Sequence, residues 1–405
     1  MPLEAVDAAL DRVALTVVDL VKLRGAPFRV SLFMSAPWTT VLRMSDHRVL
    51  RSFLAPEGDA VHALAPLVLD GAPAVIGKHG DGALWTCDLT TGERVARPID
   101  LDSAAPEDPV PDAEGTIWGD DEGEDLEGEK GEADAYEVVS RLTAATLDGR
   151  PVIVTGGGRF DLTSLLGEDY MGGAVRCWDL ATGEKVGKTM TGHGLGVTAL
   201  SILPSERGSL VLSSSEEGVL LVSALASGER VAEIRGSYNG AMTAAVVNGR
   251  PLAITGGHDP HVEVWDALTG EAVGGARQTG DYVYAIAVTE LADRTVILTG
   301  GDDNSLRIWD LASGQPVGVP LSGHADAIQE ITLTRLGGRP IAVTEAREEP
   351  PRIWDLARAE QLGGTLAVPD EQAPTAVTVA EINGEPVVVT GHDDGTIRVW
   401  SISAA

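Results

Sequence analysis

Histidine and aspartate stand close together in several Gly-rich segments, and these are the side chains best suited to chemistry in this chain. The groups are His79 with Asp81, His258 and His261 with Asp259, and His392 with Asp393. An imidazole beside a carboxylate can move a proton or hold a metal ion. Polar residues of this kind are also favoured in tight turns. We therefore expect no metal site, no cofactor and no catalytic residue.

The segment 183–189 reads Gly-Glu-Lys-Val-Gly-Lys-Thr and resembles a phosphate-binding loop that is one residue short. A loop of that type precedes a helix, where its backbone amides hold the phosphate. Here the segment falls in a turn between two antiparallel strands, and the corresponding turns at Gly270 and Gly314 lack the Lys-Thr pair. We interpret it as a turn without nucleotide chemistry.

Residues 102–137 contain fifteen Asp and Glu residues and one basic residue, Lys130. Carboxylates such as Asp120 and Glu122 could converge on Ca²⁺, but the segment lacks the ligand order and the central Gly of an EF-hand. It also lacks the apolar periodicity of a helix or a strand. We expect a solvated, disordered loop that cannot bury enough apolar surface to fold.

The chain is strongly acidic, with a formal net charge of −31. Nucleic-acid affinity comes mostly from Lys and Arg that replace counterions, so we expect no nucleic-acid partner and no binding to an anionic membrane. No segment approaches the roughly 18–20 apolar residues that span a bilayer. The N-terminal residues lack the start of a secretory signal, and two cysteines cannot make a disulfide framework. We predict a cytoplasmic protein, and its Lys-poor usage is typical of a high-GC bacterial genome.

A repeat with a period near 44 residues organises most of the chain. Its marker is a Trp, or a residue in place of Trp, in one strand of each unit. The marker positions are 87, 178, 223, 265, 309, 354 and 400. The later intervals are 42 to 46 residues, and the first interval of 91 holds additional segments. Self-similarity of this length indicates stacked units of one supersecondary type.

Each unit has the pattern of four antiparallel strands. Residues 327–333 alternate between apolar and polar, whereas residues 387–390 are almost uniformly apolar, as expected for a strand covered on both faces. Turns such as Asn383-Gly384 separate the strands. Four strands in about 40–45 residues make one propeller blade. The expected fold class is all-β, a seven-bladed β-propeller of four-stranded antiparallel blades.

The repeat resembles the WD40-repeat family over about residues 40–405. Trp178-Asp179 and Trp309-Asp310 look like the WD dipeptide of this family, and Gly323-His324 looks like its GH dipeptide. The resemblance implies a tetrad inside a blade, made of a His, a Ser or Thr, a loop Asp and the Trp. It assigns structural roles in the repeat to Trp178, Asp179, His193, Trp265, Trp309, Asp310, His324, Trp354 and Trp400.

Departures from the family pattern predict that most tetrads are incomplete. The sixth blade has His324, but its loop at 347–349 reads Arg-Glu-Glu without an Asp. The third blade has Ser223 in place of the Trp, and the fifth blade has no GH histidine. Apolar packing is therefore expected to contribute most of the stability of the blades.

Both ends of the chain are expected to have structural roles. Residues 48–53 resemble a fourth strand, and the last unit stops one strand short, so pairing of the two would close the ring and remove exposed sheet edges. Residues 3–24 have apolar positions three and four apart, which predicts an amphipathic helix. This helix either docks on its own propeller or binds a second copy or a partner. We assign residues 1–37 to the helix and its lead-in, and residues 38–405 to the propeller.

Two insertions are expected on one rim of the ring beside the second blade. The acidic loop 102–137 precedes that blade, and a loop insertion at 159–171 separates its second and third strands. In WD40 propellers this rim, the top face, is the usual site of partner binding. The shared position indicates a binding site, although length drift in two unconstrained loops explains it equally well.

The leading hypothesis is a non-catalytic scaffold whose top face binds a basic or mixed-charge protein partner. The expected contact residues are Phe160, Tyr170, Tyr238, Tyr282, Tyr284, His258, Asp302 and His392. The alternative is an enzyme of the lyase or hydrolase type with a small-molecule site at the mouth of the channel. That alternative requires His, Asp and Arg side chains that converge from different blades.

Overall fold

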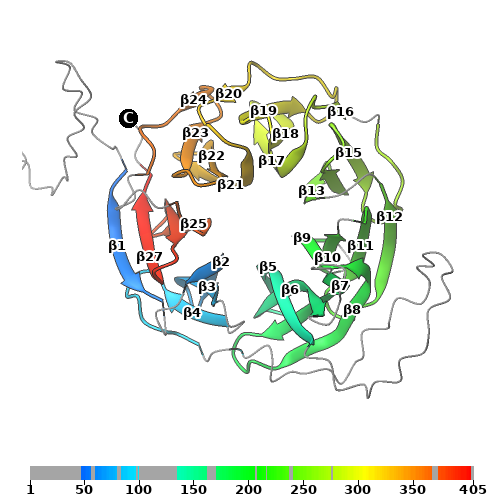
Figure 1. Ribbon diagram of the computed structural model, residues 1–405, viewed down its shortest axis with the longest axis vertical. Helices are drawn as coiled ribbons and strands as arrows, with labels where there is room; N and C mark the ends of the chain where they lie inside the picture. Colours follow the sequence, from blue (N-terminus) through cyan, green and yellow to red (C-terminus); the bar gives the residue numbers. More distant parts are fainter. Residues whose placement is uncertain are drawn as a thin grey trace, which may run out of the picture.

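The computed structural model describes residues 47–55, 60–79, 84–96, 99, 135–161, 170–205, 208–215, 217–236, 240–274, 277–366 and 373–402. They form seven antiparallel sheets arranged as a ring around one axis (Figure 1). The fold class is therefore an all-β, seven-bladed propeller, as predicted. These residues contain no helix, and the helix predicted over residues 3–24 lies outside them. Accordingly, no helix among them could cross a membrane.

The strands of each blade run from the axis outward in chain order. Blade one has β2 (Val61–Leu69), β3 (Ala72–His79) and β4 (Leu84–Asp88), and blade two has β5 (Ala135–Leu147), β6 (Arg150–Asp161), β7 (Tyr170–Asp179) and β8 (Lys185–Leu195). Blade three has β9 (Val197–Leu203), β10 (Leu210–Ser215), β11 (Val219–Ala224) and β12 (Arg230–Arg235), and blade four has β13 (Ala241–Val247), β14 (Arg250–Gly256), β15 (His261–Asp266) and β16 (Arg277–Gln278).

The remaining blades follow the same order. Blade five has β17 (Val283–Leu291), β18 (Arg294–Gly301), β19 (Ser305–Asp310) and β20 (Leu321–Ser322), and blade six has β21 (Ile328–Leu336), β22 (Arg339–Ala346), β23 (Arg352–Asp355) and β24 (Glu360–Gln361). Blade seven has β25 (Ala376–Ile382), β26 (Glu385–Gly391), β27 (Thr396–Ser401) and, on the outside, β1 (Val49–Leu54). In blade one, two single bridges, Leu84 to Ile99 and Cys87 to Arg94, hold the outer position.

The two ends of the propeller meet in blade seven. Strand β1 pairs antiparallel with β27, with Phe53 opposite Ile397 and Val49 opposite Trp400. The buried His47 adds a contact of its ring Nε2 with the carbonyl oxygen of Leu362, 2.9 Å away. Because β1 lies far from β27 in the sequence, the ring is closed by a sheet between its first and last described strands.

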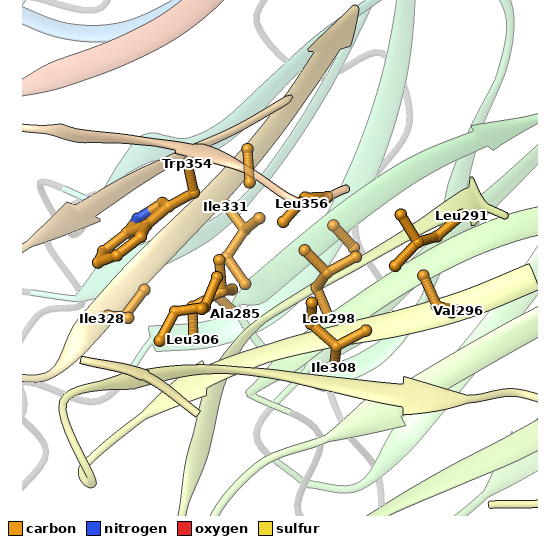
Figure 2. Packing of buried hydrophobic residues seen from close by; sticks show 13 residues of the cluster. Ala285, Leu291, Val296, Leu298, Leu306, Ile308, Ile328, Ile331, Trp354 and Leu356 are labelled. Carbon is orange, nitrogen blue, oxygen red and sulfur yellow. The ribbon is translucent and has the colours of Figure 1, made fainter. Parts of the chain in front are cut away.

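The apolar core is divided among seven clusters, one at each contact between neighbouring blades. Figure 2 shows the cluster between blades five and six, where Leu298 and Leu306 face Ile328 and Trp354. Leu298, Leu306 and Ile328 are each 0% exposed. Fully burying one such side chain contributes about 1.5–3 kcal/mol. Each blade is therefore stabilised mainly by the two blades beside it.

The hairpins between first and second strands use residues that accept a left-handed backbone. Asn248 and Gly249 have φ of 51° and 76° between β13 and β14. Two consecutive residues with positive φ make the turn whose twist matches that of paired strands, and Asn-Gly is its preferred sequence. The Asn383-Gly384 turn between β25 and β26 has the same form, with φ of 55° and 79°.

In blade two the strand boundaries differ from those expected around the two insertions. The segment predicted as a loop at 159–171 instead continues two strands, because β6 extends to Asp161 and β7 starts at Tyr170. Strand β5 starts at Ala135, inside the segment predicted as an acidic loop, and pairs with Asp161 at its first residue. Residues 101–134 and 162–169 lie outside the described part of the chain. The sheet of blade two is thus longer than its neighbours.

Candidate functional site

Four side chains from blades four and five form a cluster on the rim where second strands turn into third strands. His258 lies in the turn after β14, Asp302 in the turn after β18, and Tyr282 and Tyr284 at the start of β17. The ring centroids of His258 and Tyr282 are 5.4 Å apart, and those of His258 and Tyr284 are 6.4 Å apart, edge to face. We call His258, Tyr282, Tyr284 and Asp302 the rim cluster.

The rim cluster combines aromatic surface with an acidic group. Tyr282 is 44% exposed, whereas Tyr284 is half-buried. Burial raises the pKa of Tyr284, and Asp302, which accepts a hydrogen bond from its hydroxyl, raises it further, while the positive charge of Arg347 in blade six opposes them. Tyrosines with one dry and one wet edge are typical of protein interfaces.

Backbone hydrogen bonds from two blades hold the exposed tyrosine in place. The amide of Val283 donates to the carbonyl oxygen of Gly257 (2.9 Å), and the amide of Asp302 donates to that of Tyr282 (3.3 Å). Gly301 permits this approach, since a Cβ there would lie 1.8 Å from the Tyr282 carbonyl oxygen. The ring of Tyr282 is therefore presented by a fixed backbone.

Blade six contains a complete tetrad beneath the same rim, contrary to the expectation from its sequence. His324 contacts Thr344 Oγ1 through Nε2 (2.7 Å) and Glu349 through Nδ1 (3.1 Å). The indole N–H of Trp354 donates to the same Thr344 hydroxyl (2.8 Å). Glu349 therefore takes the place of the loop Asp, because its longer side chain reaches the histidine from the turn.

The bond between the marker Trp and a strand Thr recurs around the ring. In each case the indole N–H donates to a Thr hydroxyl on the second strand of the same blade. The pairs are Trp178 with Thr155, Trp265 with Thr255, Trp309 with Thr299 and Trp400 with Thr390, at 2.9 to 3.1 Å. Each Trp packs in the cluster shared with the preceding blade.

The comparison with known families agrees with this geometry. The family model described as "WD domain, G-beta repeat" matches residues 277–310 and 376–401, which are parts of blades five and seven. The chain is a WD40-repeat protein. The crystal structure of the computationally designed Ika8 protein is similar, with a TM-score of 0.52 and 22% identity over 86% of this chain and 98% of that chain. At this identity the similarity shows the fold alone, and no curated protein matches the chain.

The Asp of the WD dipeptide stabilises the opposite rim of this WD40-repeat protein. In blade four, Asp266 Oδ1 accepts from the amides of Leu268 and Thr269, both at 3.0 Å, and so caps the turn between third and fourth strands. Its Oδ2 binds Arg250 at 2.6 Å. Blade two repeats the ion pair with Arg150 and Asp179 at 3.1 Å. These aspartates tie two hairpins together, which is a structural role.

His392 does not belong to the contact surface to which we assigned it. It is 3% exposed, and its Nε2 lies 2.9 Å from the Thr390 hydroxyl that also accepts from Trp400. The histidine therefore completes a buried polar group from the turn after the second strand of blade seven, and not from a position ahead of the first strand. The buried His193, near the end of β8 in blade two, contacts Ser213 and Ser215 of blade three. In blade three, Ser223 stands at the position where five other blades have Trp.

Blade one fills its Trp position in a way that the marker spacing missed. Cys87, at the expected position, is 0% exposed, and Trp85, two residues earlier on the same strand, is 1% exposed in the same cluster. A Cβ at Gly77 would lie 2.1 Å from the Trp85 ring. Glycine at that position therefore makes room for the displaced indole.

The other expected contact residues lie apart from the rim cluster. Phe160 pairs in the backbone register with Tyr170 and with Tyr136, which places three aromatic residues in one row across the extended sheet of blade two. That blade is separated from blades four and five by blade three. Tyr238 lies outside the described residues.

The residues considered for catalysis are not brought together in the described part of the chain. His258 is exposed on blade four, His261 is half-buried in β15 beside Glu263, and His392 is buried in blade seven. Among the residues with described side chains, no three metal-ligating groups share a site. The channel-mouth enzyme hypothesis therefore gains no supporting geometry.

The buried histidines predict a loss of stability in mild acid. Burial is the largest cause that lowers the pKa of both His193 and His392 from 6.5 to about 4. As the pH falls, the two histidines take up protons in the unfolded chain before they do so in the folded chain. Their contribution to the free energy of unfolding is therefore complete above about pH 6.5 and is lost as the pH falls from 6.5 towards 4. Between pH 7 and pH 5 each histidine should lower the free energy of unfolding by about 2 kcal/mol.

Urea unfolding at pH 7 and pH 5 measures this effect when the wild type is compared with a His193→Asn, His392→Asn variant. The comparison is needed because burial, followed by the charge of Glu330, raises the pKa of Glu345 to about 8. The contribution of Glu345 has the opposite sign, since it is lost as the pH rises. The variant should lose less stability on acidification, and an equal loss in the two proteins contradicts the prediction.

Proposed function

We propose that this WD40-repeat protein is a non-catalytic scaffold that binds a protein partner through the rim cluster. WD40 propellers generally mediate protein–protein interactions. The observation that carries the proposal is the exposed Tyr282 ring, which lies against His258 and is held by backbone bonds from two blades. A rigid aromatic side chain loses little entropy when it is covered, so such residues often dominate binding.

The charges around the rim cluster favour a basic or mixed-charge partner. Asp302 is exposed in the cluster, and Asp281 and Asp259 are the chain neighbours of Tyr282 and His258. The net charge of −31 adds a long-range field. Such a field accelerates association with a basic partner and makes the rate depend on salt. The same negative field disfavours binding to nucleic acid and to anionic membranes. We propose that the complex forms in the cytoplasm.

The extended sheet of blade two supports a contact area wider than the rim cluster. Its added residues lie at the ends of β5, β6 and β7 on the same rim, where β6 turns towards β7. The acidic segment leads directly into β5. A partner that spans the ring could touch both blade two and the rim cluster.

Affinity capture from the native cell tests the proposal with two matched variants. Tyr282→Ser removes the exposed ring of the rim cluster. Val246→Ser removes a side chain of similar exposure, 49%, from a hairpin on the opposite rim of blade four. Loss of an aromatic anchor costs about 2 kcal/mol or more, which is roughly a 30-fold loss of affinity.

We expect a stoichiometric protein with the wild type and the Val246→Ser variant, and its loss with the Tyr282→Ser variant. Recovery of the same proteins with all three forms contradicts the role of the rim cluster. If no protein is recovered with any form, the scaffold proposal is wrong as stated.

A further inference from the structure

Two glutamates of blade six stand opposite each other beside the axis of the ring. Glu330 lies on the innermost strand, β21, and the Cα register pairs it with Glu345 on β22. Directly opposed residues of antiparallel strands have Cβ atoms about 4.5–5.5 Å apart on one face of the sheet, and like charges placed in this way repel. The two carboxyl groups therefore share one small volume.

Blades one and two have one basic residue at these positions, in the pairs Ala63 with Lys78 and Arg141 with Gly156. The four other blades have two small residues, such as Ala285 with Gly300 in blade five and Ala376 with Gly391 in blade seven. A Cβ at Gly300 would meet Ile328 of the next blade at 2.5 Å, and a Cβ at Gly391 would meet Val61 at 2.5 Å. Packing between blades therefore favours small residues at this level in most of the ring. Two acidic side chains in blade six are not required by the fold.

The environment of the pair leaves polar atoms without partners. Oε2 of Glu345 is shut off from solvent, and within the described residues no donor reaches it. The hydroxyl of Thr332, two residues after Glu330 on the same face of β21, is also buried and unpaired among the described groups. A buried polar group without a partner costs about 1–3 kcal/mol. Glu330 itself is exposed, so solvent reaches this member of the pair.

One basic residue faces the pair from another blade. Arg141 lies directly after the register shift in β5, and Glu330 lies directly after the register shift in β21. The two residues therefore occupy equivalent positions in blades two and six. The charge of Arg141 lowers the pKa of Glu330, whereas desolvation by the protein that surrounds the axis, the larger influence, raises it although the side chain reaches solvent. The guanidinium of Arg141 donates to the carbonyl oxygen of Ser140 at 3.0 Å. Arg141 therefore acts on Glu330 through space, and it donates no hydrogen bond to Oε2 of Glu345.

We propose that Glu330 and Glu345 form a binding site for one organic cation, a guanidinium or an ammonium group. One positive charge between the two carboxylates offsets their repulsion. A planar guanidinium can donate parallel N–H groups to both of them, the strongest form of charge-assisted hydrogen bond. The site lies on the axis and uses no residue of the rim cluster.

A metal ion fits these ligands less well than an organic cation. Ca²⁺ takes six to eight oxygen ligands, whereas the pair supplies two carboxyl groups. Within the described side chains, no third Asp, Glu, His or Cys joins them as a metal ligand. A guanidinium or ammonium group brings directional donors and needs fewer protein ligands.

Binding should be coupled to loss of a proton. Burial, and then the charge of Glu330, raises the pKa of Glu345 to about 8, so this carboxyl group is mostly protonated at pH 7. A cation favours the ionised form and lowers the pKa. The affinity should therefore rise as the pH rises from 7 to 9, and binding at pH 7 should release up to one proton.

Calorimetric titration of the full chain tests the site with two probes, agmatine and the blocked peptide acetyl-Ala-Arg-Ala-amide. Agmatine represents a free small cation, and the peptide represents a side chain of a partner. The variants are Glu345→Gln, which removes one charge of the pair, and Glu381→Gln, which removes an exposed charge near the far end of β25. Thermal unfolding of both variants checks that the fold is retained.

We expect at least one probe to bind the wild type and Glu381→Gln at least tenfold more tightly than Glu345→Gln. Titrations in buffers of different ionisation enthalpy should show the released proton. Binding of agmatine identifies a small-molecule site, and binding of the peptide alone identifies a site for a partner's side chain. The proposal is overturned if the affinities are equal in all three proteins, if neither probe binds at millimolar concentration, or if Ca²⁺ binds through Glu345 and displaces the probe.

Discussion

Replacing Trp354 with Ala should lower the free energy of unfolding by about 3–5 kcal/mol. Trp354 is 2% exposed and fills the contact between blades five and six (Figure 2). Its indole also donates to Thr344, whose hydroxyl links the indole to His324. The substitution therefore opens a cavity and breaks a buried hydrogen-bond network. Urea unfolding followed by far-ultraviolet circular dichroism measures the change.

The Trp354→Phe variant separates the two contributions. It keeps most of the ring volume but loses the N–H donor, so we expect a smaller loss of about 1–2 kcal/mol. A Trp354→Ala variant whose unfolding free energy lies within about 1 kcal/mol of the wild type, far below the usual cost of such a cavity, would show that the interblade clusters do not hold the ring together.

Replacing Gly301 with Ala should disturb both the fold and the rim cluster. The added Cβ would lie 1.8 Å from the Tyr282 carbonyl oxygen, so the backbone of one of the two segments must move. Overpacking of this kind typically costs about 1–3 kcal/mol. Because the same displacement removes the hydrogen bond from Asp302 to Tyr282, partner capture should fall together with the melting temperature.

Gly364 provides the matched control for this substitution. It lies in blade six, and a Cβ there would meet nothing within 4 Å. The Gly364→Ala variant should therefore retain the melting temperature and the captured partner. If Gly301→Ala behaves like Gly364→Ala, the start of β17 is not fixed in the way that the backbone bonds indicate.

The repeat period was enough to predict the blades, because each unit carries its own strands, turns and marker residue. Trp309 and Thr299, for example, recur at one spacing in most blades. Blade one departs from the pattern, because its Trp is at position 85 and Cys87 occupies the marker position, with both side chains in the interblade cluster. Gly77, which admits the Trp ring, was a signal that alignment by marker position alone overlooked.

The tetrad of blade six shows a limit of reasoning from residue type. The sequence pattern requires an Asp, and residues 347–349 contain none. The structure shows that Glu349 reaches His324 from a turn in which Glu348 has a positive φ of 55°. The additional methylene group of Glu, compared with Asp, compensates for the different backbone path of this turn. The sequence does not show that path.

The rim cluster was predicted as individual residues and not as a site. His258, Tyr282 and Asp302 come from three separate connections, and only the order of blades in the ring brings them together. Glu330 and Glu345 were missed entirely, since each fits the alternation of an ordinary strand. Alignment of the units would have placed them where four sister blades have only small residues.

Hydrogen–deuterium exchange of the complex with the captured partner tests the central claim most directly. If the partner binds the rim cluster, hydrogen exchange should slow on binding in the peptides that cover residues 257–259, 281–284 and 301–304. The hairpins on the opposite rim, such as residues 247–250, should exchange at an unchanged rate. Protection confined to those hairpins, with none at the rim cluster, would contradict the proposed function.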